Sequence, residues 1–217
     1  MRKFTASLAI AAGLLIAPFT AFAAPEGEGW AQKFDEDRIQ IYTRDDGRRY
    51  NAYHAETIID APLEVVIATL SKAGDMANYV EKFTETTVLE QPSETEYLIY
   101  MVMKTPPLND RDMVQRGTLK YINDKEIVVE IVNQPDAHPE QKGRTRIRDM
   151  DQKWTAKELE DGRTFVQQIG YTDPDVGWMM SGMVDGMLPQ EIYAVLSDVR
   201  DAVEAAAKNQ ETANAAQ

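Results

Sequence analysis

Three adjacent residues have the side chains best suited to chemistry. Asp110, Arg111 and Asp112 lie in TPPLNDRDMV, a proline-rich segment between two strand-like stretches, and two carboxylates beside a guanidinium could hold a metal ion or transfer protons. Side chains alternate between the faces of a strand, so Asp110 and Asp112 would share one face and Arg111 would lie on the other. The prolines and Asn109 also favour a turn. We therefore interpret the segment as a hairpin junction in which Arg111 pairs with a carboxylate.

The chain has two histidines and no cysteine. His138 lies beside Asp136 and Glu140 in a proline-flanked loop, which we interpret as a solvated turn because metal ligands need rigid elements to hold them. His54, in NAYHAET, is expected on a strand with no identifiable nucleophile or orienting partner. A nucleophile elbow, a glycine-rich phosphate loop and a dinucleotide fingerprint are all absent from the sequence. We expect no metal site, no cofactor and no catalytic residue.

The N-terminus has the three parts of a secretory signal. MRK is a basic start, SLAIAAGLLIAPF is an apolar core, and TAFAA offers small residues before a cleavage site. An uncleaved membrane anchor is the alternative, but a bilayer span needs about 20 apolar residues. We expect residues 1–23 to be a cleaved signal peptide. With no cysteine for lipid attachment, the protein is expected to be exported and periplasmic.

Charge and length narrow the function classes. The net charge is −13, and cleavage would remove two further basic residues, so nucleic-acid binding is disfavoured. The rest of the chain, about 190 residues, suits one domain, placed at residues 24–207. Residues 208–217, rich in Ala, Asn and Gln, lack apolar periodicity and are expected to be a disordered tail.

The elements that must position these residues follow from periodicity. Residues 39–43 and 50–59 predict a β-hairpin around DDGR, and residues 60–70 and 75–81 predict helices. Six strand-like runs follow, from TETTVLEQ to TFVQQIGYT, and predict an antiparallel meander. A long amphipathic helix ends the chain, and Pro189 should kink or split it. The fold class is α+β: one antiparallel sheet of about eight strands covered by a C-terminal helix.

Two apolar features leave a choice open. EYLIYMVMK is apolar at nearly every position, as in a strand sandwiched between the core and another element, or in a curved sheet around an apolar cavity. WMMSGMVDGM places four methionines beside two glycines on the final helix. Methionine suits surfaces that meet more than one shape, although such a stripe is also typical of an ordinary core.

The combined pattern resembles the START domains, the lipid-transfer domains related to the steroidogenic acute regulatory protein. The likeness rests on NDRDMV after a proline pair, on DQKWTAKELEDGRTFVQQIGYTDP, and on DPDVGWMM leading into the helix that contains LSDVR. It covers residues 30–203. The family tends to carry an aromatic residue between the prolines, where this chain has TPPL, and D-P-G-G, where it has DPDVG.

The resemblance implies a helix-grip fold, a curved antiparallel sheet wrapped around the C-terminal helix with an internal hydrophobic cavity. It implies a monomer that holds one sterol, phospholipid or fatty-acid-like ligand and touches membranes transiently. We expect these side chains to line the cavity: Tyr100, Met101, Met103, Trp154, Met180, Met183, Val184 and Met187.

Two other functions stay open. The helix-grip superfamily includes enzymes, and a cyclase or hydrolase acting on an apolar substrate would need an ionisable group in the cavity, for which Asp185, Glu130 and His54 are the candidates. A protein-binding or peptide-binding module would instead need an open groove.

Overall fold

The computed structural model describes residues 25–215, in which ten strands form one sheet. The expected signal peptide, residues 1–23, lies outside the described residues. The elements in chain order are β1 (Ala31–Glu36), β2 (Ile39–Arg44), β3 (Ala52–Ile59), α1 (Leu63–Leu70), the 3-10 helix η1 (Ala73–Asn78), β4 (Phe83–Ser93), β5 (Glu96–Met103), β6 (Arg111–Asn123), β7 (Glu126–Asn133), β8 (Thr145–Arg146), β9 (Asp149–Glu158), β10 (Thr164–Asp173) and α2 (Ser181–Ala215).

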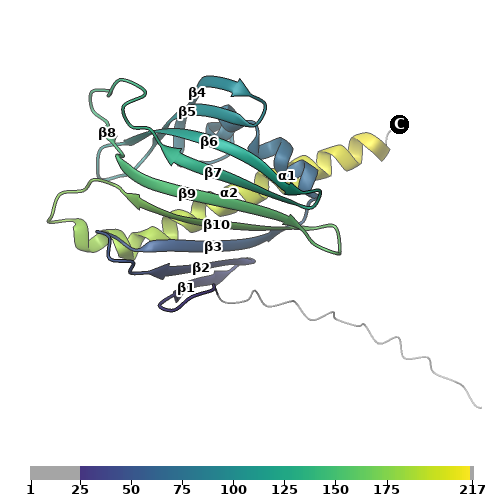
Figure 1. The fold of residues 1–217 in the computed structure, drawn as a ribbon, viewed down its shortest axis with the longest axis horizontal. Helices are drawn as coiled ribbons and strands as arrows, with labels where there is room; N and C mark the ends of the chain where they lie inside the picture. The colour runs from purple at the N-terminus through teal and green to yellow at the C-terminus, as the bar shows by residue number, and fades with distance from the viewer. Residues whose placement is uncertain (1–24, 216–217) are drawn as a thin grey trace, which may run out of the picture.

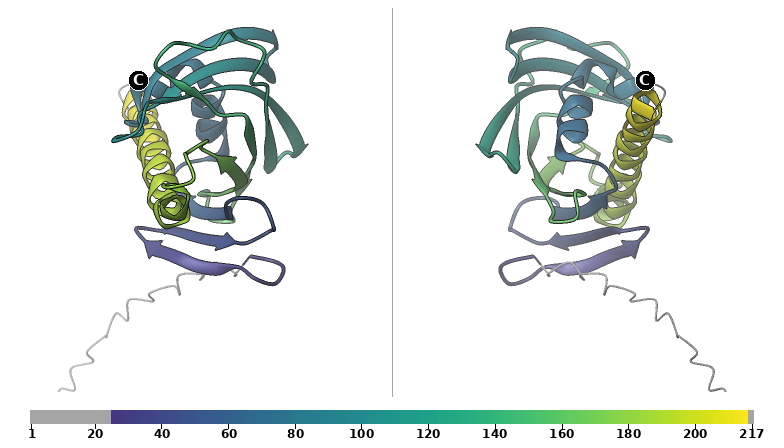
Figure 2. Two further views of the ribbon diagram at one scale, coloured as in Figure 1. Left: turned by 90° about the vertical axis from the view of Figure 1, so that its left-hand side faces the viewer. Right: turned by 90° about the vertical axis from the view of Figure 1, so that its right-hand side faces the viewer.

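The pairing of β3 with β10 joins the three N-terminal strands to the rest of the sheet. The strand order is β1-β2-β3-β10-β9-β7-β6-β5-β4, with antiparallel neighbours throughout, and the short β8 pairs in parallel with β6. The sheet curves around α2, and α1 lies on the same concave side (Figures 1 and 2). This confirms the helix-grip architecture expected from the sequence.

The apolar stripe of α2 faces the sheet. Leu196, Val199 and Val203 are fully buried in the main core, together with Ile39 and Ile41 of β2. Helix α2 continues through Pro189 as one element, so the expected split does not occur.

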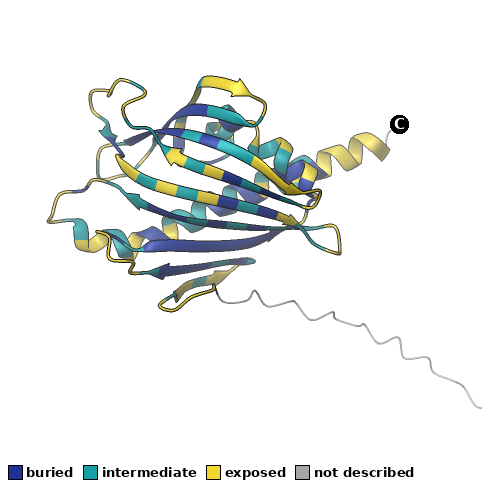
Figure 3. Cartoon of the chain, in the orientation of Figure 1, coloured by how far each residue is buried: buried dark blue, intermediate teal, exposed yellow. Residues whose placement is uncertain are grey.

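The expected disordered tail is wrong for residues 208–215. Helix α2 continues to Ala215, although this last stretch is exposed (Figure 3). The stretch contains Ala, Glu, Lys and Gln, which favour helix, and no Gly or Pro, so a helix already nucleated upstream can propagate through it. The remaining two residues lie outside the described part of the chain.

Two strands differ from the sequence-based prediction. Strand β1 was not expected, because most of its side chains are exposed and its sequence shows little apolar alternation. The run RTRIRDMDQKWTAKEL was expected to be one strand, but it forms β8 and β9 with a break between them. The break lets Arg146 turn toward Asp112 on β6.

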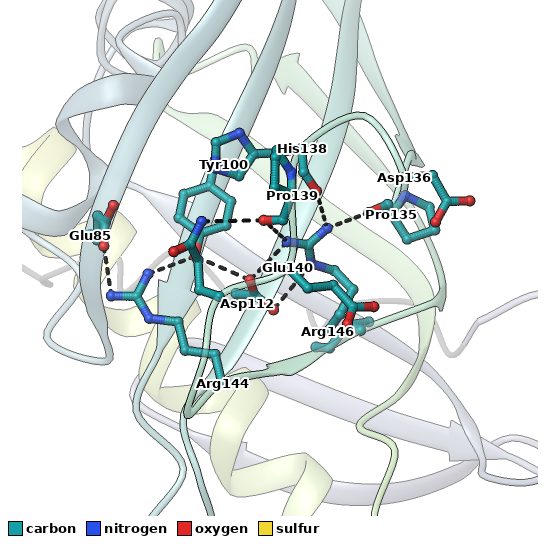
Figure 4. Close-up of polar contacts among 12 residues, drawn as sticks. Glu85, Tyr100, Asp112, Pro135, Asp136, His138, Pro139, Glu140, Arg144 and Arg146 are labelled. Atoms are coloured by element: carbon teal, nitrogen blue, oxygen red, sulfur yellow. Dashed lines mark hydrogen bonds and ion pairs between the residues drawn. The ribbon is translucent and has the colours of Figure 1, made fainter.

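Both interpretations of EYLIYMVMK hold at once. Ile99 and Met101 of β5 point to the concave side and join the main core. Leu98, Tyr100 and Val102 form a second buried cluster on the convex side. The segment between β7 and β9 covers Tyr100 from outside (Figure 4). The strand is therefore sandwiched, and its inner face also borders a cavity.

Candidate ligand-binding cavity

A cavity of about 210 Å³ lies between the concave face of the sheet and α2. The strands contribute Met101, Met103, Met113, Leu119, Val129, Ile131, Met150 and Trp154 to its wall. Helix α2 contributes Val184, Met187, Leu188, Ile192 and Val195. Apolar pockets of this kind, with few polar groups, are typical of small-molecule sites.

Charged groups are scarce in the cavity wall. Among the described residues that line it there is no lysine, arginine or histidine. The acidic residues are Glu94, which is exposed at the turn between β4 and β5, and Glu191, which pairs with Lys82. Burial raises the pKa of the Tyr97 phenol above its ordinary value, so this lining residue stays neutral. The cavity therefore suits an uncharged ligand.

Three glutamines give the cavity its polar character. Gln115, Gln152 and Gln168 lie on β6, β9 and β10, with their side chains in the wall. The amide of Gln115 donates to the sulfur of Met150 at 2.9 Å. None of the three was singled out from the sequence, because a glutamine on a strand is ordinarily a solvent-facing residue.

Five of the eight residues expected to line the cavity do so: Met101, Met103, Trp154, Val184 and Met187. They come from β5, β9 and α2, and the curvature of the sheet brings them together. That they bind a ligand stays a prediction. The wall also includes Met113, which faces Met101 across the β5–β6 pairing and could have been found only with the strand register.

Tyr100 does not line the cavity. It points to the convex side, opposite Met101, because neighbouring side chains on a strand alternate. Its hydroxyl donates to Asp112 at 3.1 Å and accepts from Arg144 at 2.6 Å (Figure 4). The expectation was wrong because a strand that is apolar on both faces gives no periodicity from which to assign the inner face.

Met180 and Met183 also lie outside the cavity wall. Met180 packs against a separate cluster formed by Tyr50, Tyr171 and Val176. Met183 is on the outer side of the first turn of α2 and is 54% exposed. The expected helical grouping of the four methionines does not hold, because Met179 and Met180 precede α2, and of the four only Met187 lines the cavity.

The Asp110–Asp112 segment is a structural junction. It connects β5 to β6 as expected, and Arg111 donates to the carbonyls of Asn109 at 2.6 Å and Pro174 at 3.0 Å. The expected pairing of Arg111 with a carboxylate is therefore wrong. Asp112 instead pairs with Arg146, whose side chain also donates to carbonyls of the loop around His138 (Figure 4).

The ionisable residues proposed for catalysis lie away from the cavity wall. His54 contacts Glu56 at 2.5 Å on the outer side of β3, where Trp30 and Tyr42 pack against its ring. Glu130 pairs with Lys120 on an exposed face. Asp185 accepts a hydrogen bond from the backbone of Asn51 at 2.8 Å.

Within residues 25–215, no three His, Cys, Asp or Glu side chains are grouped so that they could hold a metal ion. None of the helices in that range is both long and apolar enough to cross a membrane.

The chain was compared with family models, with curated proteins and with solved structures. No family model matches the chain. An uncharacterized protein of Pseudomonas aeruginosa is 23% identical over 178 residues, which span 82% of this chain and 88% of that relative.

Solved structures are similar over most of the chain. A STAR-related lipid transfer protein from Xanthomonas axonopodis has a TM-score of 0.74 at 22% identity, covering 81% of this chain and 99% of that one. Human StAR-related lipid transfer protein 5 has a TM-score of 0.73 at 17% identity, covering 85% and 88%. An aromatase/cyclase from Streptomyces has a TM-score of 0.51 at 15% identity, covering 70% and 92%.

The curved sheet, the enclosed helix and the apolar cavity define a helix-grip protein. Within that class, the chain has the fold of the START-related lipid transfer domains.

Proposed function

We propose that this protein is exported and holds one lipid-like molecule in the cavity beneath α2, shielding it from water. The predominantly apolar cavity wall, which has no cationic side chain among the described lining residues, is the observation that carries the proposal. Each Å² of apolar ligand surface removed from water contributes about 25 cal/mol, so binding needs no specific chemistry beyond a fitting interior. The lipid transfer proteins of the same fold, and the signal-like residues 1–23, support transport of a lipid through the periplasm. We propose that the protein does this as a monomer.

Ligand entry is proposed at the start of α2. Trp178 and Met179 are 83% and 78% exposed there, and Met187 is both partly exposed and part of the cavity wall. The segment between β10 and α2 lies at one end of the sheet (Figure 1). Exposed Trp and Met side chains suit the boundary between water and a bilayer. We propose that this segment touches a membrane transiently and opens as a lid while the ligand passes.

Native mass spectrometry of the protein purified from its own host tests the proposal. A copurified apolar molecule, removable by delipidation and taken up again in a one-to-one ratio, is the expected result. Delipidated, folded protein that takes up no sterol, fatty acid or phospholipid would refute the proposed function.

An enzyme acting on an apolar substrate is the second candidate, because the Streptomyces aromatase/cyclase shares the fold. The same mass measurement separates the two functions. With chromatographic separation added, a carrier releases its ligand with unchanged mass and retention. A hydrolase changes the mass, and a cyclase changes the mass where water is lost and the retention where it is not.

A further inference from the structure

Gln168 has an unusual position in the cavity wall. It lies on β10, is 3% exposed, and lines the cavity. Its Nε2 donates to the hydroxyl of Tyr53 at 3.0 Å. Its Oε1 is buried and has no hydrogen-bond partner within residues 25–215. Buried amide oxygens nearly always accept a hydrogen bond, so this atom indicates a donor that arrives with a ligand.

The contact between Gln168 and Tyr53 is held in place by the sheet. Tyr53, on β3, pairs in register with Gly170 on β10 and is fully buried. A Cβ added to Gly170 would lie 2.7 Å from the Tyr53 hydroxyl, so the missing side chain makes room for the phenol. Burial raises the pKa of Tyr53, so its hydroxyl stays protonated and neutral. The Gln168 amide is therefore held at Nε2 by Tyr53, while its Oε1 has no partner in the described chain.

The surroundings restrict what the donor can be. No cationic side chain lines the described cavity wall, so a carboxylate or phosphate would lose its hydration without gaining a counter-charge. Glu191, a half-buried carboxylate in the wall, is already neutralised by Lys82. An uncharged hydroxyl avoids this cost. It can donate to the free end of the amide, and its own oxygen can accept a hydrogen bond from another donor.

We propose that Gln168 recognises a single uncharged hydroxyl on an otherwise apolar ligand, with its Oε1 accepting the hydrogen bond and Tyr53 fixing the amide. The ligand is then a lipid alcohol and not a fatty acid or a phospholipid. This inference rests on the proposed function, because it assumes that the cavity holds an apolar molecule, and it adds a specificity determinant to it.

The test compares three probes with the same hydrocarbon body: dodecanol, dodecane and dodecanoate. Their binding to the delipidated full chain is measured by competition at roughly pH 8, where the acid is ionised. One hydrogen bond that satisfies a buried acceptor should make dodecanol bind about tenfold more tightly than dodecane. Dodecanoate should bind more weakly than dodecanol.

Gln168→Met keeps the size of the side chain and removes the acceptor. It should bring the ratio of dodecanol to dodecane affinity to one or below, because the hydroxyl of dodecanol is then buried without its acceptor. Gln167→Met is the matched control, since Gln167 is the next residue on β10, lies on the opposite face and pairs with Glu56. That variant should keep the full preference.

Each other outcome also decides the question. A Gln168→Met variant that keeps the preference for dodecanol overturns the inference, as does wild-type protein that binds dodecanoate at least as tightly as dodecanol. In both cases the proposed function would stand. Failure of the wild-type protein to bind any of the three probes would overturn the proposed function itself.

Tyr53→Phe provides a second route if Gln168→Met does not fold. It removes the hydroxyl that anchors the amide and retains the ring beside Gly170. The preference for dodecanol over dodecane should fall severalfold. An unchanged preference would contradict the role assigned to Gln168 and Tyr53.

Discussion

Asp112 and Arg146 form an ion pair that is almost completely buried on both sides. The Oδ2 of Asp112 lies 2.9 Å from Nη2 of Arg146, its Oδ1 lies 3.1 Å from Nε, and the side chains are 1% and 2% exposed. Arg146 also donates to the carbonyls of His138 and Pro139. The pair therefore connects the loop that covers β5 to the start of β6.

Asp112→Ala should lower the free energy of unfolding by about 3 to 5 kcal/mol, because it leaves a buried guanidinium unpaired. Urea denaturation measures the change. Asp136→Ala is the control, since Asp136 pairs with Arg148 on an exposed surface and its loss should leave the melting temperature unchanged. Equal effects of the two substitutions would contradict the assigned role.

The strand and helix pattern was predictable, but this pair was not. Alternation identified the predicted strands, and the apolar stripe identified α2, because both signals are local. Asp112 and Arg146 are 34 positions apart and meet only after β8 separates from β9. The cavity wall depends likewise on register: Tyr100 was misplaced because its strand is apolar on both faces, and Gln168 gave no local signal at all.

Arg111→Ala should loosen the segment between β10 and α2. Arg111 is buried and donates to the carbonyls of Asn109 and Pro174, and each lost bond from a charged donor costs roughly 1.5 to 3 kcal/mol. Hydrogen exchange should become faster in residues 174–180, and the melting temperature should fall.

Arg116→Ala is the control for the loss of a positive charge on β6, because Arg116 pairs with Glu90 and Glu96 at the surface. It should leave exchange in residues 174–180 unchanged. Unaltered thermal stability of Arg111→Ala together with lost lipid uptake would instead make Arg111 a ligand-binding residue.

Tyr79→Phe should not destabilise the protein at neutral pH, because the hydroxyl of Tyr79 is buried without a hydrogen-bond partner in the described chain. Burial raises its pKa above the ordinary value of 10.0. The unfolded phenol therefore ionises first, so stability is fully present below that value and is lost as pH rises above it.

The variant should thus lose less stability than wild type between neutral pH and about pH 11, as measured by urea denaturation. Tyr121→Phe, at an exposed tyrosine, is the control and should follow the wild-type pH profile. Parallel profiles for Tyr79→Phe and wild type would show that Tyr79 ionises equally in both states.

Ile131→Trp should fill the cavity. Ile131 is on β7 with its side chain in the cavity wall, whereas the next residue, Val132, is 59% exposed on the outer face. The larger side chain should reduce lipid uptake at least about tenfold and cost about 1 to 3 kcal/mol of stability through overpacking. Val132→Trp, the matched control, should leave uptake unchanged. Normal uptake by Ile131→Trp would place the ligand elsewhere.

Trp178→Ser combined with Met179→Ser should slow exchange of ligand with lipid vesicles without changing the affinity for ligand in solution. Both side chains are exposed beside the proposed entrance, and a tryptophan transfers up to about 250 Å² of surface to the bilayer boundary, so the transfer rate should fall at least about tenfold. Tyr121→Ser is the control, because Tyr121 is exposed beside α1. Helix α1 and the start of α2 lie at opposite ends of the sheet (Figure 1). A fluorescent-lipid transfer assay separates the two properties. Equal slowing by the control would place membrane contact away from α2, and lost affinity in solution would mean that the two residues hold the ligand.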